Sequence, residues 1–415
     1  MFYALRYKSI NQTNMKSHKF FILSLAVMSV TAHGQLFTPL GLGIEKCERK
    51  ANFYQPQMHV EGNTLYVCTK QGLYSKSISI DNSSWQLVGF EGIPLQDYAR
   101  NGDDIIALRH NVNGNFLLLS HDGGRTYNDI TPDLFTVGDL DVIMVMKKLI
   151  QHPIDPNTLL VSSDWGLFQS TDFGQTWNEL SSKGLLFAMS GYIGYHQLNP
   201  KVIFNSDESS LPFNLYISYN GGQSWNDVSS IFSGDKSIKR IAFHPTDNNN
   251  WIVGGSSAVN ISSDNGKTWN TQSFTGDALR NAIWCYTAYD SDNSNVIYMA
   301  GRTNDKIEVM CSANGGKTWS IPQTESMKKP SLEKINDMKQ SGDKLFIYTE
   351  SDVYEISKEQ LISQTTCAQG IAATSTQISS ECFDLLGRRI DSPSGLTIVV
   401  TRYSDGTTRT EKKLF

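Results

Sequence analysis

The chain has 415 residues, of which 39% are hydrophobic and 19% charged, a balance typical of a globular protein and not of a disordered one. Its formal net charge of -5 argues against a nucleic-acid-binding protein. Glycine is abundant and aromatic residues make up 11%, which favours strands and turns over long helices.

The N-terminal residues 1–34 read as an upstream extension followed by a secretory signal peptide that begins at Met15. A basic stretch (16–19) precedes an apolar stretch (20–30), and small residues allow cleavage before Gln35. The apolar stretch is short for a membrane span, and no later stretch reaches the roughly 18 apolar residues that a membrane helix needs. We therefore expect export to the cell surface or medium, with no transmembrane segment after signal cleavage. An uncleaved anchor is the alternative.

An exported chain can form disulfides, and cysteines tend to pair with neighbours in the sequence. That would join Cys47 with Cys68, Cys285 with Cys311, and Cys367 with Cys382. Roughly fifteen connectivities are possible for this number of cysteines, so the pairing stays open. The sequence has neither a Cys-x-x-Cys motif nor a His/Cys ligand cluster, so we expect no metal and no cofactor.

One eight-residue pattern recurs five times along the middle of the chain. It reads SHDGGRTY at 120–127, STDFGQTW at 170–177, SYNGGQSW at 218–225, SSDNGKTW at 262–269 and SANGGKTW at 312–319. The starts are 50, 48, 44 and 50 residues apart, a period typical of a propeller or a solenoid. About four short strand-like stretches fill each period, which favours the propeller, whose blades have four strands.

Two further units, 63–77 and 343–357, keep the strand-like stretches but lack the pattern. We therefore predict an all-β fold: a single β-propeller of seven blades of four antiparallel strands, with six or eight blades as alternatives. The predicted domains are the propeller (35–357), a polar linker (358–380) and a small C-terminal β domain (381–415). The last unit shows only three strands, so a segment around 53–60, or slightly earlier, should supply the fourth and close the ring.

The repeated pattern predicts a hairpin between the third and fourth strands of a blade. An acid or amide at its third position can accept backbone N–H bonds across the turn, and the glycine two positions later supplies a positive φ. These acids and amides are Asp122, Asp172, Asn220, Asp264 and Asn314. The last residue buries an aromatic ring between blades: Trp177, Trp225, Trp269, Trp319 and, in the first pattern, Tyr127. Asparagine at two acid positions argues against metal binding or acid catalysis, so we interpret the pattern as structural.

The pattern resembles the Asp-box, or BNR, repeat of sialidases, sortilin, xyloglucan-specific glucanases and a photosystem assembly factor. The resemblance covers most of residues 55–357. In the resembling enzymes the active site lies on the propeller face opposite the Asp-boxes. Here that face would carry the loops 164–166, 207–214 and 302–306 and the links between blades.

Three arginines near that face, each from a different blade, are candidates for binding an anionic group: Arg240, Arg280 and Arg302. Alternatively, each arginine pairs with a nearby acid, such as Asp235, Asp277 or Asp305. Trp165 is a candidate for stacking on a sugar, together with Phe213 and Trp284. Trp284 is better suited to packing between blades, because it lies inside a predicted strand.

A glycoside hydrolase needs two carboxylates spaced across a cleft. The candidate catalytic acids are Asp164, Asp207 and Glu208, with Asp139 and Asp141 in a link between blades. The sialidase signature Arg-Ile-Pro is missing, and the nearest stretch is Gly92-Ile93-Pro94. The glucanases that carry this box have two propellers facing each other, whereas this chain has one. His152 and His244 each precede a proline at matching blade positions, which indicates a turn device and not a metal pair.

The C-terminal stretch 383–389, FDLLGRR, resembles the C-terminal sorting domain of the type IX secretion system in Bacteroidota. This family usually continues with Gly-hydrophobic-Tyr, where the present chain has Gly395-Leu396-Thr397. The resemblance implies that the secretion machinery is a partner of this tail. The alternative is a plain β appendage that packs on the propeller.

Together these patterns predict an exported binding or assembly module that recognises an extracellular protein or glycan on the face opposite the Asp-boxes. The alternative is a glycoside hydrolase, sialidase-like or xyloglucanase-like, that acts on extracellular glycans. The missing catalytic signatures favour the binding module, and the question of enzyme activity stays open.

Overall fold

The computed structural model describes residues 36–43, 54–80, 83–111, 114–137, 142–143, 145–164, 166–180, 190–207, 214–232, 240–255, 258–274, 283–302, 306–321, 327–328, 334–367, 371–372, 377–384, 388–391, 396–403 and 408–414. The predicted signal peptide lies outside these residues. No helix in the described part of the chain is long and apolar enough to cross a membrane.

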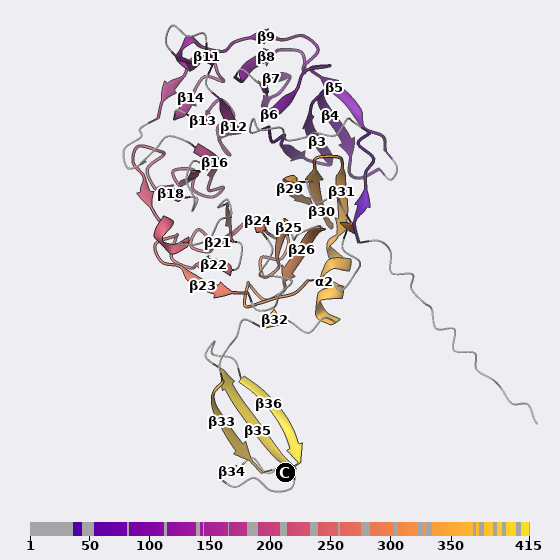
Figure 1. The fold of residues 1–415 in the computed structure, drawn as a ribbon, viewed down its shortest axis with the longest axis vertical. Coiled ribbons are helices and arrows are strands. Elements are labelled where there is room, and N and C mark those ends of the chain that lie inside the picture. The colour runs from indigo at the N-terminus through magenta and orange to yellow at the C-terminus, as the bar shows by residue number, and fades with distance from the viewer. Residues whose placement is uncertain are drawn as a thin grey trace, which may run out of the picture. The chain divides into compact units, whose positions relative to one another are not determined.

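Seven of the four-stranded antiparallel sheets that the described strands form are the blades of a β-propeller, so the predicted fold is confirmed (Figure 1). Blade 1 contains β2 (Met58–Glu61), β3 (Thr64–Thr69), β4 (Gly72–Ser77) and β5 (Gln86–Gly89). Blade 2 contains β6 (Leu95–Asn101), β7 (Asp104–Arg109), β8 (Phe116–Ser120) and β9 (Asn128–Asp129). Blade 3 contains β12 (Met146–Gln151), β13 (Leu159–Ser163), β14 (Leu167–Ser170) and β15 (Asn178–Glu179).

The next three blades follow the same order. Blade 4 contains β16 (Ser190–Tyr195), β17 (Ile203–Asp207), β18 (Asn214–Ser218) and β19 (Asn226–Asp227). Blade 5 contains β20 (Ile241–Phe243), β21 (Trp251–Gly254), β22 (Ala258–Ser262) and β23 (Asn270–Ser273). Blade 6 contains β24 (Ile283–Tyr289), β25 (Ile297–Arg302), β26 (Lys306–Ser312) and β28 (Met327–Lys328).

Blade 7 joins the two ends of the propeller. Its strands β29 (Ile335–Ser341), β30 (Lys344–Thr349) and β31 (Val353–Ser357) are completed by β1 (Thr38–Pro39), which pairs with β31. The strand that closes the ring therefore lies before 53–60, which agrees with the prediction of a segment around 53–60 or slightly earlier. The first strand of blade 1 contacts the first strand of blade 7, so the ring is closed.

Short elements lie between and after the blades. They are η1 (Asp133–Phe135), the hairpin of β10 (Thr136–Val137) and β11 (Val142–Ile143), η3 (Ser229–Phe232), and β27 (Thr318–Trp319), which pairs with β32 (Ile371–Ala372). Helix α2 (Lys358–Cys367) occupies the start of the segment expected to be a linker. The C-terminal sheet has the order β34 (Arg389–Ile390), β33 (Gln377–Phe383), β35 (Leu396–Tyr403) and β36 (Thr408–Leu414).

Each Asp-box turn lies between the third and fourth strands of its blade, and the Oδ1 of its acid or amide accepts the backbone N–H of the residue four positions later. In blade 3, Asp172 Oδ1 accepts the N–H of Thr176 at 2.9 Å and Oδ2 accepts its hydroxyl at 2.6 Å. In blade 4 the amide oxygen of Asn220 accepts the N–H of Ser224 at 3.0 Å, so the turn does not require a charge. Gly174, the box glycine of blade 3, has φ of +80°, a conformation that glycine adopts without strain.

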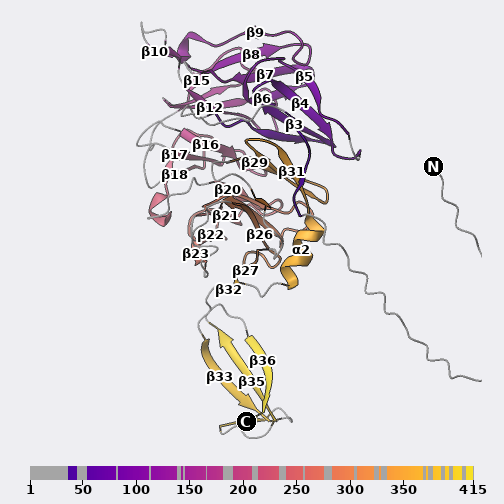
Figure 2. The same cartoon turned by 45° about the vertical axis from the view of Figure 1, so that its right-hand side comes forward.

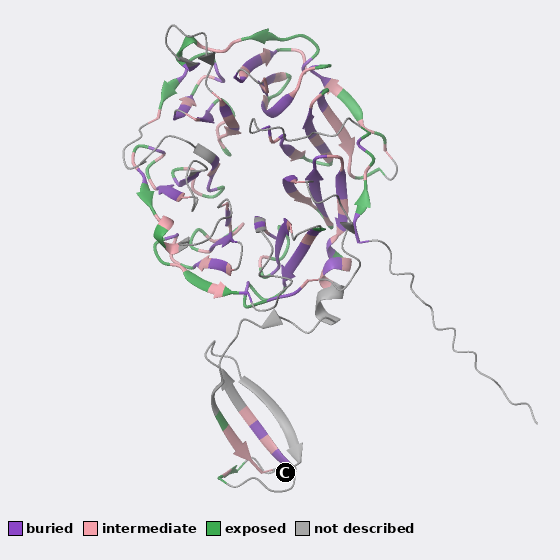
Figure 3. Ribbon diagram, in the orientation of Figure 1, coloured by how far each residue is buried: buried purple, intermediate pink, exposed green. Residues whose placement is uncertain are grey.

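The box aromatic residues fill the seams between blades. Trp177 shares a buried cluster with residues of blades 2 and 3, and Trp319 shares one with residues of blades 5 and 6. Tyr127 differs, since it stays 37% exposed and stacks on Phe90 at 5.3 Å. Figure 3 shows that burial decreases from the inner strands of each blade, which are buried, to the outer strands, such as β9, β15 and β19, which are exposed. Trp284 is fully buried in a seam, the alternative favoured from the sequence.

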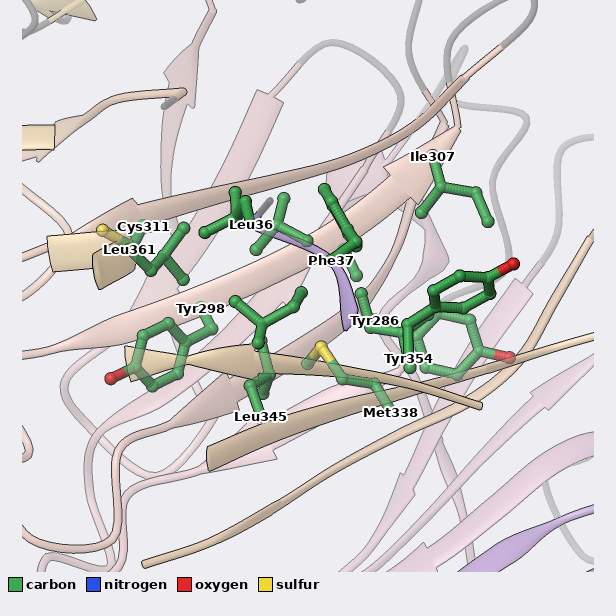
Figure 4. Packing of buried hydrophobic residues seen from close by; sticks show 14 of the residues in the cluster. Leu36, Phe37, Tyr286, Tyr298, Ile307, Cys311, Met338, Leu345, Tyr354 and Leu361 are labelled. Carbon is green, nitrogen blue, oxygen red and sulfur yellow. The ribbon is translucent and has the colours of Figure 1, made fainter. Parts of the chain in front are cut away.

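Blade 7 has no Asp-box, and other parts of the chain fill the seam between blades 6 and 7. Leu36 and Phe37 from the N-terminal segment and Leu361 from α2 are buried in one cluster there (Figure 4). Lys358, the first residue of α2, forms a buried ion pair of 2.9 Å with Asp290 of blade 6. Helix α2 contacts β26 and β31, as both views of the ribbon show (Figure 2).

The cysteine pairing expected from the sequence is wrong for at least two pairs. Cys68 and Cys382 carry free thiols, so neither Cys47–Cys68 nor Cys367–Cys382 forms. Cys68 lies on β3 in the buried seam between blades 1 and 2, where apolar packing, and not a disulfide, surrounds the sulfur. Cys47 lies outside the described residues.

Candidate functional site

The first strands of several blades carry a bulge that redirects side chains. In blades 2, 3, 4, 6 and 7 the pairing of the first and second strands skips one residue: Gln96, Lys147, Gly191, Cys285 and Asn336. A bulge bends its strand and re-aims the neighbouring side chains, and such bulges are common beside functional sites. The repetition of this bulge at one blade position makes the residue that follows it a candidate site residue.

The residues that follow these bulges, with their counterparts in blades 1 and 5, define what we call the central ring. Each lies four positions before the residue that opens the turn between the first and second strands. From blade 1 to blade 7 the central ring is Gln57, Asp97, Lys148, Tyr192, Arg240, Tyr286 and Asp337. Turns alternate between the two ends of an antiparallel sheet, so the first half of each first strand lies near the face opposite the Asp-boxes.

Arg240 lies between two aromatic rings of the central ring. Its guanidinium carbon is 3.5 Å from the ring centre of Tyr192 and 3.8 Å from that of Tyr286, the neighbours on its two sides. Nη1 is also 3.9 Å from Oδ1 of Asp337. Stacking on both faces fixes the plane of a guanidinium, whose N–H groups then point along that plane.

The other charged residues of the central ring are one lysine, Lys148, and two aspartates, Asp97 and Asp337. The Lys148 ammonium donates a hydrogen bond to Oε1 of Gln57. Burial lowers the pKa of Lys148 to about 8, although the carboxylates of Asp97 and Asp337 act in the opposite direction. The ammonium therefore loses its proton more readily than that of an exposed lysine.

Asp337 is almost fully buried and accepts several hydrogen bonds. Its Oδ2 is 3.1 Å from Lys339 Nζ and accepts the N–H of Met58 at 3.2 Å. Burial alone would raise the pKa of Asp337, but the charges of Lys339, Lys148 and Arg240 together hold it below its ordinary value. Asp337 is therefore a carboxylate at neutral pH.

Asp97 is the second buried acid of the central ring. Its Oδ1 is 2.7 Å from Nε2 of His59, on the first strand of blade 1, and accepts the N–H of Tyr98 at 3.0 Å. The Asp97 side chain is fully buried, whereas that of His59 is 34% exposed. Blades 1 and 2 are thus joined at the centre by a histidine–carboxylate contact.

The segment 54–57 enters blade 1 beside the central ring and fixes part of it. The Tyr54 hydroxyl donates to the carbonyl of Leu95 at 3.0 Å, at the start of blade 2. The Gln55 amide donates to the hydroxyl of Tyr286 and to the carbonyl of Asn336, both at 2.8 Å. One short segment therefore connects blades 2, 6 and 7 and holds the ring of Tyr286 against Arg240.

The structure describes only some of the ligand-binding residues that were predicted from the sequence. Arg240 belongs to the central ring, and Arg302 ends β25, where it is half-buried and pairs with Ile283 and Ile307. Arg280 and Trp165 lie outside the described residues, as do Phe213 and the acids Asp235, Asp277 and Asp305. The acid that meets Arg240 is Asp337 of another blade.

The candidate catalytic acids do not form a described pair. Asp164 is half-buried after β13, and its Oδ1 accepts the N–H of Val145 at 3.0 Å, which fixes the chain as it enters blade 3. Burial raises the pKa of Asp164 above its ordinary value. Asp207 ends β17 and pairs with Ser190 and Asn214. Glu208, Asp139 and Asp141 lie outside the described residues.

Most of the central ring escapes an inspection of motifs, because its members share neither a residue type nor a local pattern. The signal that can find them is the pair of histidines that precede a proline at matching blade positions, His152 and His244. Counting back four positions from His152 and His244 gives Lys148 and Arg240, and the same count gives the members in the other blades.

The comparisons with known proteins agree with the fold. A family model described as sortilin, neurotensin receptor 3 (Sortilin-Vps10) matches residues 213–384. A search of curated proteins finds no match. The GH74 xyloglucanase from Xanthomonas campestris has 16% identity and a TM-score of 0.52, over 82% of this chain and 56% of that chain. A GH74 enzyme from Niastella koreensis has 15% identity and a TM-score of 0.53, over 91% of this chain and 60% of that chain.

A third similar structure is the extracellular domain of a protein described as a hybrid two-component system from B. thetaiotaomicron. It has 11% identity and a TM-score of 0.52, over 92% of this chain and 47% of that chain. The present chain thus spans only 56% and 60% of the two GH74 structures. At such identities the similarity concerns the fold. The structural neighbours therefore indicate the β-propeller fold, and residues 213–384 resemble the Sortilin-Vps10 family model.

Proposed function

We propose that this protein is an exported binding module that recognises an extracellular protein or glycan on the face opposite the Asp-boxes. One observation carries the proposal: at the position of the central ring every blade places a polar, charged or aromatic side chain, and the residue type changes between each blade and the next. The opposite face repeats a single turn. A ring of different side chains on equal supports is suited to recognition, whereas a repeated turn is suited to holding the scaffold.

The chemistry of the central ring favours an acidic or hydroxyl-rich group on the ligand. Arg240 is held rigid by Tyr192 and Tyr286, so little side-chain freedom is lost when its N–H groups meet an acceptor. Lys148 and Lys339 add two further positive charges near the same centre. Arg280, Arg302 and Trp165 are proposed to extend the binding site outward from the central ring, along the loops of the same face.

Export is part of the proposal and depends on two sequence features. The apolar stretch 20–30 has the form of a secretory signal, and the tail around 383–389 resembles a type IX sorting domain. Secretion machinery would be the partner of the tail. The protein would then work outside the cell, at the surface or in the medium.

Binding of the purified protein to glycan arrays and to immobilised extracellular proteins tests the proposal. Arg240→Gln and Lys148→Met should weaken capture of the ligand about tenfold or more, because each leaves a charged partner uncompensated. Lys267→Ala, on an exposed box turn, is the matched control and should bind normally. Near-UV circular dichroism checks that each variant is folded. Capture of no ligand at all, or equal loss with the control, would contradict the proposal.

A glycoside hydrolase is the second candidate, and one observation favours it: burial raises the pKa of Asp164, as a general acid requires. Its partner carboxylate would be Asp207 or Glu208. Hydrolysis of sialosides or β-glucans that disappears in Asp164→Ala, Asp207→Ala or Glu208→Ala would replace the binding function by an enzymatic one. Turnover of neither substrate class would leave the binding module as the proposed function.

A further inference from the structure

Four consecutive blades share one loop between their first and second strands, on the Asp-box side. In each, the N–H of the first loop residue donates to the carbonyl six residues later at 2.9 Å. The first residues are His152, His196, His244 and Asp290, in blades 3 to 6. We call the three histidines the turn histidines.

The side chain of each turn histidine accepts backbone hydrogen bonds inside its own loop. Nδ1 of His152 accepts the N–H of Asp155 at 3.0 Å, Nδ1 of His196 accepts that of Leu198 at 3.1 Å, and Nδ1 of His244 accepts that of Thr246 at 3.2 Å. In the fourth loop a carboxylate oxygen, Oδ1 of Asp290, accepts the N–H groups of residues 292 and 293 at 2.8 and 2.9 Å. An imidazole nitrogen can accept such a bond only while it carries no proton.

Each turn histidine also packs against an aromatic ring of the next blade. The centroid distances are 5.0 Å from His152 to Tyr195, 4.3 Å from His196 to Phe243 and 5.0 Å from His244 to Tyr289. The same type of contact therefore crosses three successive seams, from blade 3 to blade 6. A change in the charge of these imidazoles acts directly on the contact between blades.

The loops of the turn histidines support the Asp-box turns. The N–H of Phe173, in the box of blade 3, donates to the carbonyl of Asn157 at 2.8 Å. In blade 4 the N–H of Gly221 donates to Lys201 at 2.7 Å, and in blade 5 that of Asn265 donates to Asn249 at 3.0 Å. Loss of order in these loops would remove the partner of a box turn in the same blade.

We propose that the turn histidines form an acid-sensitive switch that loosens the Asp-box side of blades 3 to 5 when the imidazoles are protonated. A proton on Nδ1 turns the acceptor into a donor that faces another donor, so the loop loses its hydrogen bond. His196 is the principal sensor, because it is fully buried between Phe243 and Trp251 and would carry its charge into an apolar seam.

The titratable groups around the three imidazoles differ. Among the described residues, Asp155 and Tyr195 lie beside His152, Tyr289 lies beside His244, and the charge of Asp247 acts on Tyr289. The rings packed on His196, Phe243 and Trp251, do not titrate.

Burial lowers the pKa of His196 below its ordinary value, and a hydrogen bond with the backbone of Asn248 opposes this in smaller measure. A base with a lowered pKa in the folded state binds fewer protons than the unfolded chain does. The stability contributed by neutral His196 is therefore complete above about pH 6.5 and is lost as the pH falls below that value toward the folded pKa.

The first test replaces His196 by asparagine, whose amide oxygen can accept the same N–H bond but does not titrate. Acid unfolding is followed by tryptophan fluorescence and near-UV circular dichroism. The midpoint for His196→Asn should lie lower than that of the unchanged protein by about half a pH unit or more. His121→Asn, at an exposed box histidine, is the control and should show no downward shift. Equal midpoints for all three proteins would overturn the proposal.

The second test uses the unchanged protein and remains decisive if His196→Asn does not fold. Hydrogen exchange is measured at pH 7 and pH 5, and each rate is divided by its intrinsic rate at that pH. The amides of Leu198 and Gly221 should lose protection about tenfold on acidification, whereas those of Asp292 and Asn293, held by a carboxylate, should keep theirs. A similar response of the histidine loop and the aspartate loop would refute the switch.

Discussion

Two adjacent glycines in the box of blade 4 separate the cost of backbone strain from the cost of packing between blades. Gly221 and Gly222 both have positive φ, of +70° and +87°. A Cβ added at Gly221 would meet no described heavy atom within 4 Å, whereas at Gly222 it would lie 2.2 Å from Cδ2 and 2.9 Å from Cγ of Leu180. Leu180 belongs to the end of blade 3 and packs on the cluster that contains Trp225.

The two substitutions should therefore differ in the free energy of unfolding. Gly221→Ala should cost about 1–2 kcal/mol, the strain of an L-residue in the left-handed region. Gly222→Ala has the same strain and adds an overlap that Leu180 must relieve by moving, which typically costs a further 1–3 kcal/mol, by rough analogy with overpacked cores. The seam between blades 3 and 4, and not the turn, should account for the difference.

Urea denaturation of the unchanged protein and the two variants measures this difference, with the slope checked for constancy. Leu180→Ala in the Gly222→Ala background should recover about 1 kcal/mol or more of the packing term, seen as a coupling energy in a double-mutant cycle. The same change combined with Gly221→Ala should be additive. Equal destabilisation by the two glycine variants, or a coupling near zero, would refute the assignment of the box glycine to the seam.

Three further predictions concern the scaffold. Asp172→Asn should change stability by less than about 0.5 kcal/mol, since two boxes already use asparagine, whereas Asp172→Ala should cost about 1–2 kcal/mol by loss of the turn bonds in urea denaturation. Hydrogen bonds from Thr268 lower the pKa of Asp264 to about 2. The ionised carboxylate therefore stabilises the turn above about pH 4, and this stabilisation is lost as the pH falls toward 2. In Thr268→Val, NMR titration should show the pKa of Asp264 moving back up. Lys358→Met should cost about 3–5 kcal/mol in urea denaturation, because Asp290 is left buried without its cation, and adding Asp290→Asn should restore part of this loss.

The fold could be predicted because the box encodes its turn locally. An acceptor, a glycine and a hydroxyl residue within a few positions fix the hairpin of blade 3, where Asp172 and Thr176 form the expected bonds. The strand after each box is short, and its exposure gives little pattern to follow, so only the regular spacing identifies it. The period of the boxes therefore predicts the blades more reliably than the strands do.

The closure of the ring could not be placed from the sequence, because the elements involved are short or polar. Strand β1 has two residues and no alternating pattern. Helix α2 begins in a polar stretch, and its role depends on the contact of Lys358 with Asp290, far away in the sequence. Leu36 and Leu361 join one cluster only because the segments before and after the seven blades both reach the seam of blades 6 and 7. Such long-range contacts leave no local signal.

The two ends of each first strand show how one repeated scaffold supports different kinds of position. On the Asp-box side, four loops need the same acceptor, so histidine recurs there and only Asp290 departs from it. Four positions earlier, the backbone of blades 3, 4 and 6 repeats its bulge, while the side chains along blades 3 to 6 change from lysine to tyrosine to arginine to tyrosine. The backbone therefore does not dictate the central ring. What fixes Arg240 there is its contact with the rings of Tyr192 and Tyr286, so any ligand chemistry at this face depends on neighbouring blades together and not on one blade alone.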